Sequence, residues 1–360
     1  MMESDLLTYL DKYHDEPLNR TPFNEVDALL FASLSYPKYH EIIGEMEICD
    51  SESLLKRLED YDQSDLTERK KLNLVLLERI FASSRFEGIN VLHFRHSTNK
   101  DLGEQFQAVS FLFSDYLIVS FCGTDNTVVG LKEDLDMSYL KYTPSELDAM
   151  TYLKEITTLY LDKPLILVGH SKGGRLAISS AKNLEDKTAV RHIYTFDSPN
   201  YSDEFYDSDY KLISNKIHNY VPEDSIIGRL INEPKNPIVV KSHNRLIQQH
   251  DITSWIIRDN RLEISIEGYG KQATKIVNAL NQNLANCSYG ARKSFTDTLF
   301  GLLDRLDIQE FKGKEENIAM LKRTLRHIPR EWKNTPKEER VLLRKILFEI
   351  VKAYIFGEEK

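Results

Sequence analysis

The 360-residue chain has few cysteines, and they are spaced far apart. Cys49, Cys122 and Cys287 are odd in number and form no Cys-x-x-Cys pair. This pattern excludes a disulfide framework and gives no sign of a structural zinc site. The cysteine usage therefore predicts a protein of a reducing compartment.

Long apolar runs are also absent. No stretch approaches 18 uncharged apolar residues, and the first twenty residues, MMESDLLTYLDKYHDEPLNR, carry a charge every few positions. The N-terminus thus lacks the apolar region of a secretory signal peptide, and the chain is predicted to have no transmembrane segment. We expect a cytoplasmic protein.

Positive charge is not in excess, because the chain has 47 Lys and Arg residues but 56 Asp and Glu residues, which gives a formal net charge of −9. Affinity for nucleic acid comes largely from lysine and arginine contacts to phosphate, so we expect no nucleic-acid partner. The motifs His-Glu-x-x-His and Gly-x4-Gly-Lys-Ser/Thr are missing as well. We therefore expect no catalytic metal and no cofactor.

What is present is the composition of a folded protein, with 41% hydrophobic and 29% charged residues. Residues 1–85 have helical apolar spacing. After residue 89 short strand-like segments alternate with helices or long loops, which predicts an α/β fold with a mostly parallel sheet. From residue 271 the period is helical again. We expect a domain of residues 1–270, including the N-terminal helices, and a helical C-terminal domain of residues 271–360.

Local signals mark several element boundaries. The Ser114-Asp115 break predicts a hairpin turn, and Asp259-Asn260 predicts a second one. Thr143 followed by Pro144 and Glu146 predicts a helix with a capping box at its start. A second capping box, at residues 335–338, predicts the start of the last of about four C-terminal helices.

The segment LILVGHSKGGRLA, residues 165–177, places a serine between glycines where a strand should pass into a helix. Gly-x-Ser-x-Gly in that context is typical of a nucleophile elbow, a turn too sharp for larger side chains beside the serine. Ser171 is therefore the candidate nucleophile.

A serine hydroxyl needs an imidazole to take its proton and a carboxylate to orient that imidazole. In this architecture the chain order is Ser, acid, His, which leaves His218, His243 and His250. His218 falls inside a strand and His243 at the end of one. We favour His250, which lies on the following loop, as the base.

Two carboxylates follow strands in the required interval. Asp197 lies in TFDSPN and Asp224 in YVPEDSIIG. We favour Asp224, because the acid usually follows the second strand after the nucleophile and the Pro222-Glu223-Asp224 turn is rigid. Glu223 is the adjacent reserve, and Asp197 is expected to brace its own loop.

An oxyanion hole needs N–H donors where charge develops on the substrate carbonyl. The backbone N–H of Lys172, which follows the nucleophile at a helix N-terminus, is the first candidate. The segment VSFCGTDNTVVG supplies the second, since Gly123 permits close approach and Thr124 offers an N–H.

Five segments of the chain carry a family resemblance: FCGTDNTVVGLKEDLDM, LVGHSKGGRLA, YTFDSPN, VPEDSIIG and QHDITSW. They resemble a family of uncharacterised bacterial proteins close to the class 3 lipases, in the α/β-hydrolase superfamily. The resemblance covers residues 23–255. It implies an α/β-hydrolase fold with Ser171 as nucleophile, Asp224 as acid, His250 as base, and Thr124 and Lys172 as oxyanion residues. The chain departs from similar sequences at Cys122, where arginine is usual, and at Leu131, where tryptophan is usual.

The function we predict is a serine hydrolase that cleaves an acyl ester or lipid through an acyl-enzyme intermediate. The alternative is a non-catalytic α/β-hydrolase-fold protein that binds or scaffolds partners. The C-terminal helices have three open roles: a lid, the surface of a homo-oligomer, or packing on the sheet. Packing is favoured, because an amphipathic stripe is ordinary core.

Overall fold

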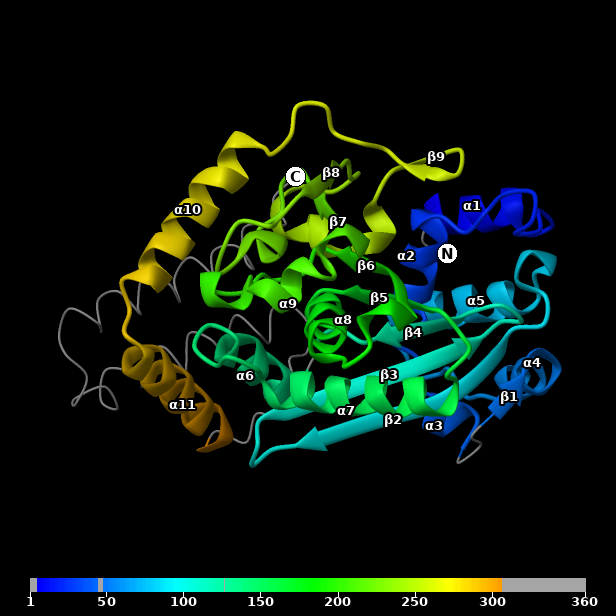
Figure 1. Ribbon diagram of the computed structural model, residues 1–360, viewed down its shortest axis with the longest axis horizontal. Coiled ribbons are helices and arrows are strands. Elements are labelled where there is room, and N and C mark those ends of the chain that lie inside the picture. Colours follow the sequence, from blue (N-terminus) through cyan, green and yellow to red (C-terminus); the bar gives the residue numbers. More distant parts are fainter. Residues whose placement is uncertain (1–4, 45–47, 126, 306–360) are drawn as a thin grey trace.

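The computed structural model describes residues 5–44, 48–125 and 127–305. An eight-stranded sheet runs through the middle of the molecule (Figure 1), with its strands in chain order from one edge to the other. The strands are β1 (Ile48–Asp50), β2 (Asn90–Asn99), β3 (Glu104–Leu112), β4 (Leu117–Phe121), β5 (Leu165–His170), β6 (Val190–Phe196), β7 (Ile217–Pro222) and β8 (Pro237–Val240).

The sheet changes direction at β4. Strands β1 to β4 pair antiparallel, whereas β4 to β8 pair parallel. The turn between β3 and β4 is closed by the Phe113 N–H donating to the carbonyl of Tyr116 at 3.0 Å, which confirms the hairpin predicted at Ser114-Asp115. The expectation of a mostly parallel sheet with crossover connections is confirmed as well.

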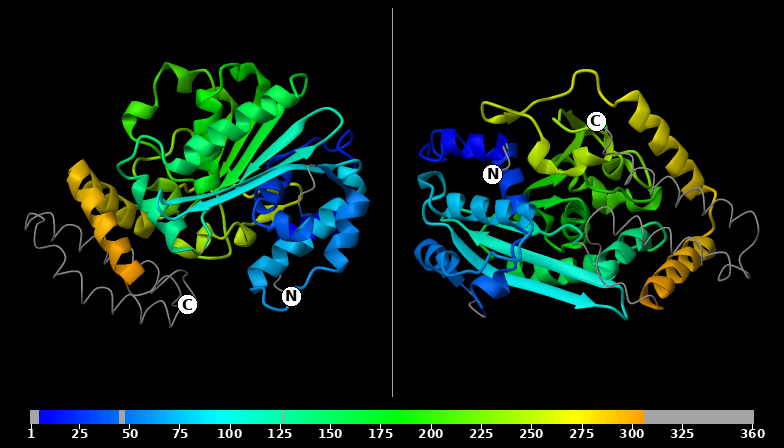
Figure 2. Two further views of the ribbon diagram at one scale, coloured as in Figure 1. Left: turned by 90° about the horizontal axis from the view of Figure 1, so that it is seen from below. Right: turned by 180° about the vertical axis from the view of Figure 1, so that it is seen from behind.

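Helices cover both faces of the sheet (Figure 2). Ahead of β2 come α1 (Asp5–Tyr13), α2 (Glu25–Ser33), α3 (Tyr39–Ile42), α4 (Ser51–Glu59) and α5 (Glu68–Phe81). Between β4 and β7 come α6 (Val128–Asp136), α7 (Pro144–Leu159), α8 (Lys172–Asn183) and α9 (Ser208–Lys211). The helical character predicted for residues 1–85 is confirmed, apart from the short strand β1.

Strand β5 shows how the two layers are held. Its side chains alternate between the faces, with Ile166 and Val168 in the core beneath α2 and Leu165 and Leu167 in the core beneath α7 and α8. All of β5 is buried, as expected for a parallel strand covered on both sides. The elbow after β5 therefore starts from a rigid base.

The predicted helix caps form where the turn chemistry is present. The Thr143 side chain accepts the Glu146 N–H, and the Glu146 carboxylate accepts the Thr143 N–H in return at 2.9 Å. This capping box starts α7 with Pro144 in its first turn. The Asp259-Asn260 hairpin also forms, between β9 (Ile257–Arg258) and β10 (Arg261–Leu262).

Two helices follow the sheet, α10 (Lys271–Ala285) and α11 (Tyr289–Arg305). Val277 and Leu280 of α10 pack against Ile226 in the loop after β7. In α11, Arg292 donates to the Ser138 carbonyl just beyond α6. The domain boundary at residue 270 stays a prediction, and the further C-terminal helices lie outside the described residues. In the described part of the chain, no helix has the length and apolar character needed to cross a bilayer.

Candidate active site

Ser171 lies in a strained turn between β5 and α8. Its backbone has φ 56° and ψ −130°, a combination that non-glycine residues rarely adopt. A Cβ on Gly169 would overlap the backbone of Gly173, and a Cβ on Gly173 would overlap the Phe121 carbonyl of β4. The serine side chain makes no capping hydrogen bond to α8. The glycines are thus required by close backbone approach, and the turn has the geometry expected of a nucleophile elbow.

His250 is paired with Asp197. The two atoms His250 Nδ1 and Asp197 Oδ2 are 2.7 Å apart, and the Asp197 side chain is 1% exposed while that of His250 is 25% exposed. Donation from Nδ1 to the carboxylate leaves the lone pair on Nε2, which is the tautomer a general base needs. His250 ends a 3₁₀ turn, Leu246–His250, that follows β8.

The Asp197 carboxylate is held on its other oxygen as well. Asp197 Oδ1 accepts the Gly228 N–H at 3.0 Å and the Ser225 hydroxyl, both from the loop after β7. The backbone of Asp197 has a positive φ of 47°, and its N–H donates to the Tyr220 carbonyl. A buried carboxylate with three hydrogen-bond donors is fixed in direction.

Asp224, the acid favoured by the sequence, is not brought to His250. Its backbone N–H donates to Gln249 Oε1 at 2.7 Å, and its carboxylate lies against Gly270, at the start of α10. The physical reason is the strand order: β6 is next to β5, and the Ser171 N–H donates to the Phe196 carbonyl, so the first residue after β6 is the strand-end carboxylate adjacent to the serine. The expectation that Asp197 only braces its loop is corrected accordingly.

The other candidate residues have different partners. His243 Nε2 is 3.3 Å from Asp5 Oδ2 with its side chain 59% exposed. His218 is in β7 and its Nε2 is 3.1 Å from His192 Nδ1 of β6. Glu223 accepts the Ser265 hydroxyl at 3.0 Å.

His170, the residue before the serine, connects the elbow to the histidine loop. Its Nε2 donates to the His250 carbonyl at 2.8 Å, and its Nδ1 accepts the Tyr36 hydroxyl at 2.7 Å. The rings of His170 and His250 have centroids 4.5 Å apart. Burial, followed by the nearby His250 and Arg69, lowers the pKa of His170 well below its usual value. His170 is thus a neutral brace, which the sequence pattern did not single out.

The loop that follows β4 comes close to the serine. A Cβ built on Gly123 would lie 3.3 Å from the Ser171 Cβ. Next to it, half-buried Thr124 donates its hydroxyl to Asp134 Oδ1 of α6 at 2.6 Å. Burial raises the pKa of Asp134 to about 6, although Lys172 and the Thr124 hydrogen bond oppose the rise. The two candidate oxyanion residues therefore flank the serine from β4 and α8.

The side chain of Lys172 forms a buried network that sequence reasoning missed. Its Nζ donates to Glu133 Oε2 of α6 at 2.8 Å and to two oxygens of Gln105 on β3. Glu133 also accepts the N–H and hydroxyl of Ser145, the first residue after the proline that opens α7. Burial opposes both charges, yet the pKa of Lys172 is raised and that of Glu133 lowered because each stabilises the other. The positions of Glu133 and Gln105 in the sequence give no indication that their side chains contact Lys172.

The two positions that depart from similar sequences have ordinary environments. Cys122 is 4% exposed, and burial raises the pKa of its thiol to about 12. The thiol therefore stays protonated at neutral pH and acts as a small apolar filler, as predicted. Leu131 is half-buried on α6.

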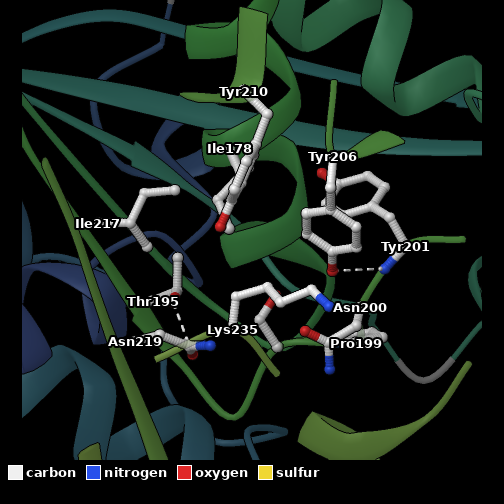
Figure 3. Close-up of a pocket in the computed structure, with 11 residues that line it drawn as sticks. Ile178, Thr195, Pro199, Asn200, Tyr201, Tyr206, Tyr210, Ile217, Asn219 and Lys235 are labelled. Atoms are coloured by element: carbon white, nitrogen blue, oxygen red, sulfur yellow. Dashed lines mark hydrogen bonds between the residues drawn. The ribbon is translucent and has the colours of Figure 1, made fainter. Parts of the chain in front are cut away.

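A small cavity lies under the loop after β6, on the side of the sheet covered by α8. Figure 3 shows the rings of Tyr201, Tyr206 and Tyr210 around it, with Lys235 reaching across. Its volume is about 10 Å³, which is room for about one water molecule. Ser171 and His250 are not among its lining residues. The cavity is a packing defect beside the loop of Asp197 and has no room for a substrate.

Among the residues that the structure describes, no group of three or more His, Cys, Asp and Glu side chains could hold a metal ion. The side chains gathered at this sheet edge are instead a serine, an imidazole and a buried carboxylate, together with backbone N–H groups at a helix start. Such a set is suited to nucleophilic acyl transfer.

The strand order, the parallel strands β4 to β8 and the serine elbow between β5 and α8 define an α/β-hydrolase fold. The chain belongs to the Mbeg1-like family, whose model matches residues 80–301. The fold of the family member seen here confirms the expected α/β-hydrolase architecture. No curated protein matches the chain in sequence.

Three solved structures are similar to the chain at low identity. The lipase of Rhizopus microsporus var. chinensis is 16% identical, with a TM-score of 0.38 over 69% of this chain and 82% of that one. A mutant form of MDLA from Penicillium cyclopium is 12% identical, with a TM-score of 0.40 over 71% and 86%. Lip2 lipase from Yarrowia lipolytica is 13% identical, with a TM-score of 0.33 over 45% and 68%.

Proposed function

We propose that the protein is a serine hydrolase that cleaves acyl esters, with Ser171 as nucleophile, His250 as general base and Asp197 as the acid that orients His250. The observation that carries the proposal is the 2.7 Å contact between His250 Nδ1 and the fully buried carboxylate of Asp197. Asp197 lies on the loop beside the strained elbow of Ser171. A surface histidine would not be expected to have such a partner.

In the proposed reaction, His250 Nε2 takes the proton of Ser171 while Oγ attacks the ester carbonyl carbon. The negative charge that develops on the carbonyl oxygen is stabilised by the backbone N–H groups of Lys172 and Thr124. The imidazolium returns its proton to the leaving alcohol as the C–O bond breaks, which gives the acyl-enzyme. Water then attacks the acyl-enzyme by the same steps and releases the carboxylic acid.

The substrate class follows from the acyl-transfer chemistry of the site together with the lipase-related family. We propose a small acyl ester or a lipid as substrate, hydrolysed in the cytoplasm without a metal or cofactor. The C-terminal helices are assigned to packing, which the contacts of α10 and α11 with the hydrolase domain support.

A fluorophosphonate probe tests the proposal, because it forms a covalent bond only with a serine that an adjacent base activates. We expect the wild type to be labelled, and Ser171→Ala and His250→Ala to remain unlabelled. A panel of acyl esters of increasing chain length then identifies the substrate. A folded wild type that neither reacts with the probe nor hydrolyses any ester would contradict the proposal and favour the non-catalytic scaffold instead.

A further inference from the structure

The side chain of Lys172 points away from the reaction it is proposed to assist. Its backbone N–H begins α8 beside the nucleophile, while its ammonium is fully buried between β3 and α6. There it donates to the Gln105 carbonyl at 2.5 Å, to Gln105 Oε1 at 2.8 Å and to Glu133 Oε2 at 2.8 Å. All three ammonium protons are therefore used.

These contacts reach Thr124 from two directions. Gln105 Oε1, which accepts the ammonium, also accepts the backbone N–H of Asp125 at 3.2 Å, the residue directly after Thr124. On the other side, Glu133 precedes Asp134, whose carboxylate accepts the Thr124 hydroxyl at 2.6 Å. One ammonium is thus connected to the backbone that follows Thr124 and to the helix turn that binds its side chain.

Stability alone gives a weak reason for this arrangement. Moving a charged group from water into a protein interior costs several kcal/mol per ion. Well-packed apolar residues can often replace a buried ion pair without loss of stability. The pair also lies at the sheet edge that carries the serine, whereas the similarly buried Arg85–Asp27 pair joins the N-terminal helices. Location therefore points to a role in the site.

We propose that Lys172 is a positioning residue for the oxyanion hole, whose ammonium holds Thr124 in place through Gln105 and through Glu133. The inference rests on the proposed function. The residue that supplies one oxyanion donor by its backbone would then fix the second donor by its side chain. The distance between the two donors is set by a single residue, so the hole is formed before substrate binds.

The expected signature is a loss of kcat with little change in KM, because oxyanion donors stabilise the transition state and contribute little to substrate binding. Removing a donor altogether costs about 10²–10³ in rate. Loosening one should cost less, and we expect a ten- to hundredfold lower kcat.

Two variants remove the support without leaving an unpaired buried charge. Gln105→Met deletes the oxygen that joins the ammonium to the Asp125 N–H and keeps the Lys172–Glu133 pair. The double variant Lys172→Met/Glu133→Gln removes both charges together. Tyr9→Phe is the matched control, since it deletes a hydroxyl that donates to buried Asp27 at 2.8 Å, in the network of the N-terminal helices.

For each variant, fluorophosphonate labelling carried to completion counts the active sites, and kcat and KM are measured on one soluble ester per labelled site. Thermal unfolding gives Tm. We expect Gln105→Met and the double variant to lose kcat per site with KM within about twofold of wild type, and Tyr9→Phe to lower Tm while keeping the wild-type kcat.

Wild-type kcat per labelled site in Gln105→Met would overturn the inference, and so would an equal loss in Tyr9→Phe. If the double variant does not fold, Gln105→Met decides. A wild type that reacts with neither probe nor ester is a different failure, since it removes the proposed function and the inference with it.

Discussion

The loops after β6 and after β7 look alike in sequence and differ in the structure. Each begins with a turn and places an aspartate within two residues of the strand end, Asp197 after Phe196 and Asp224 after Pro222. Asp197 is buried and binds His250, whereas Asp224 is half-buried and lies against Gly270. In this fold, the carboxylate that contacts His250 follows the strand beside that of the candidate nucleophile.

The second loop contributes to the site in another way. It supplies the Ser225 hydroxyl and the Gly228 N–H, which both donate to Asp197. One loop provides the carboxylate and the next provides the donors that fix it. The motif VPEDSIIG, singled out for its aspartate, belongs to the site through its serine and glycine.

The strongest test of this comparison exchanges each aspartate for asparagine. Asp197→Asn should lower kcat/KM by about 10³–10⁴, since an amide would favour the wrong tautomer of His250. Asp224→Asn should stay within a few-fold of wild type. Steady-state hydrolysis of a soluble ester measures both, and a larger loss in Asp224→Asn would restore the assignment favoured by the sequence.

A smaller effect is expected from the donors. Ser225→Ala removes a hydrogen bond to the Asp197 carboxylate, and bonds to charged groups contribute about 1.5–3 kcal/mol. We expect about tenfold lower kcat/KM. Ser265→Ala, which removes the matching hydroxyl from Glu223, is the control and should leave kcat/KM unchanged. Equal losses in the two variants would mean that the donors to Asp197 have no special part in catalysis.

The smallest effect concerns Asp134, a carboxyl whose pKa burial raises to about 6. The folded protein binds this proton more tightly than the unfolded chain does, so the group stabilises the fold below about pH 4 and loses that contribution as the pH rises through 6. Asp134→Asn keeps an oxygen to accept the Thr124 hydroxyl and does not titrate. Its Tm relative to wild type should therefore be higher at pH 7 than at pH 4.5, by a few degrees. A Tm difference that is independent of pH would contradict the raised pKa.

Much of the fold could be predicted because local signals coincide with it. The Ser114-Asp115 turn, the Thr143 capping box and the Gly-x-Ser-x-Gly elbow each depend on residues close in the chain, so their geometry follows from sequence alone. The choice of His250 as the base came from chain order and strand ends, and it stays a prediction. The sequence could not predict the Asp197 contact that sets the tautomer of His250, the hydrogen bond from Tyr36 to His170, or the Lys172 network. The residues joined in the first two contacts are 53 and 134 positions apart in the chain, and the partners of Lys172 follow no sequence pattern.

The sequence by itself determined the α/β architecture, the elbow and the position of Ser171, because hydrophobic period and glycine spacing act over short stretches of chain. Tertiary structure decided which carboxylate faces the imidazole and what surrounds the candidate oxyanion donors. The reason is physical: hydrogen-bond partners are selected by which strand ends are neighbours in the sheet, and that order is established only when the whole sheet has formed.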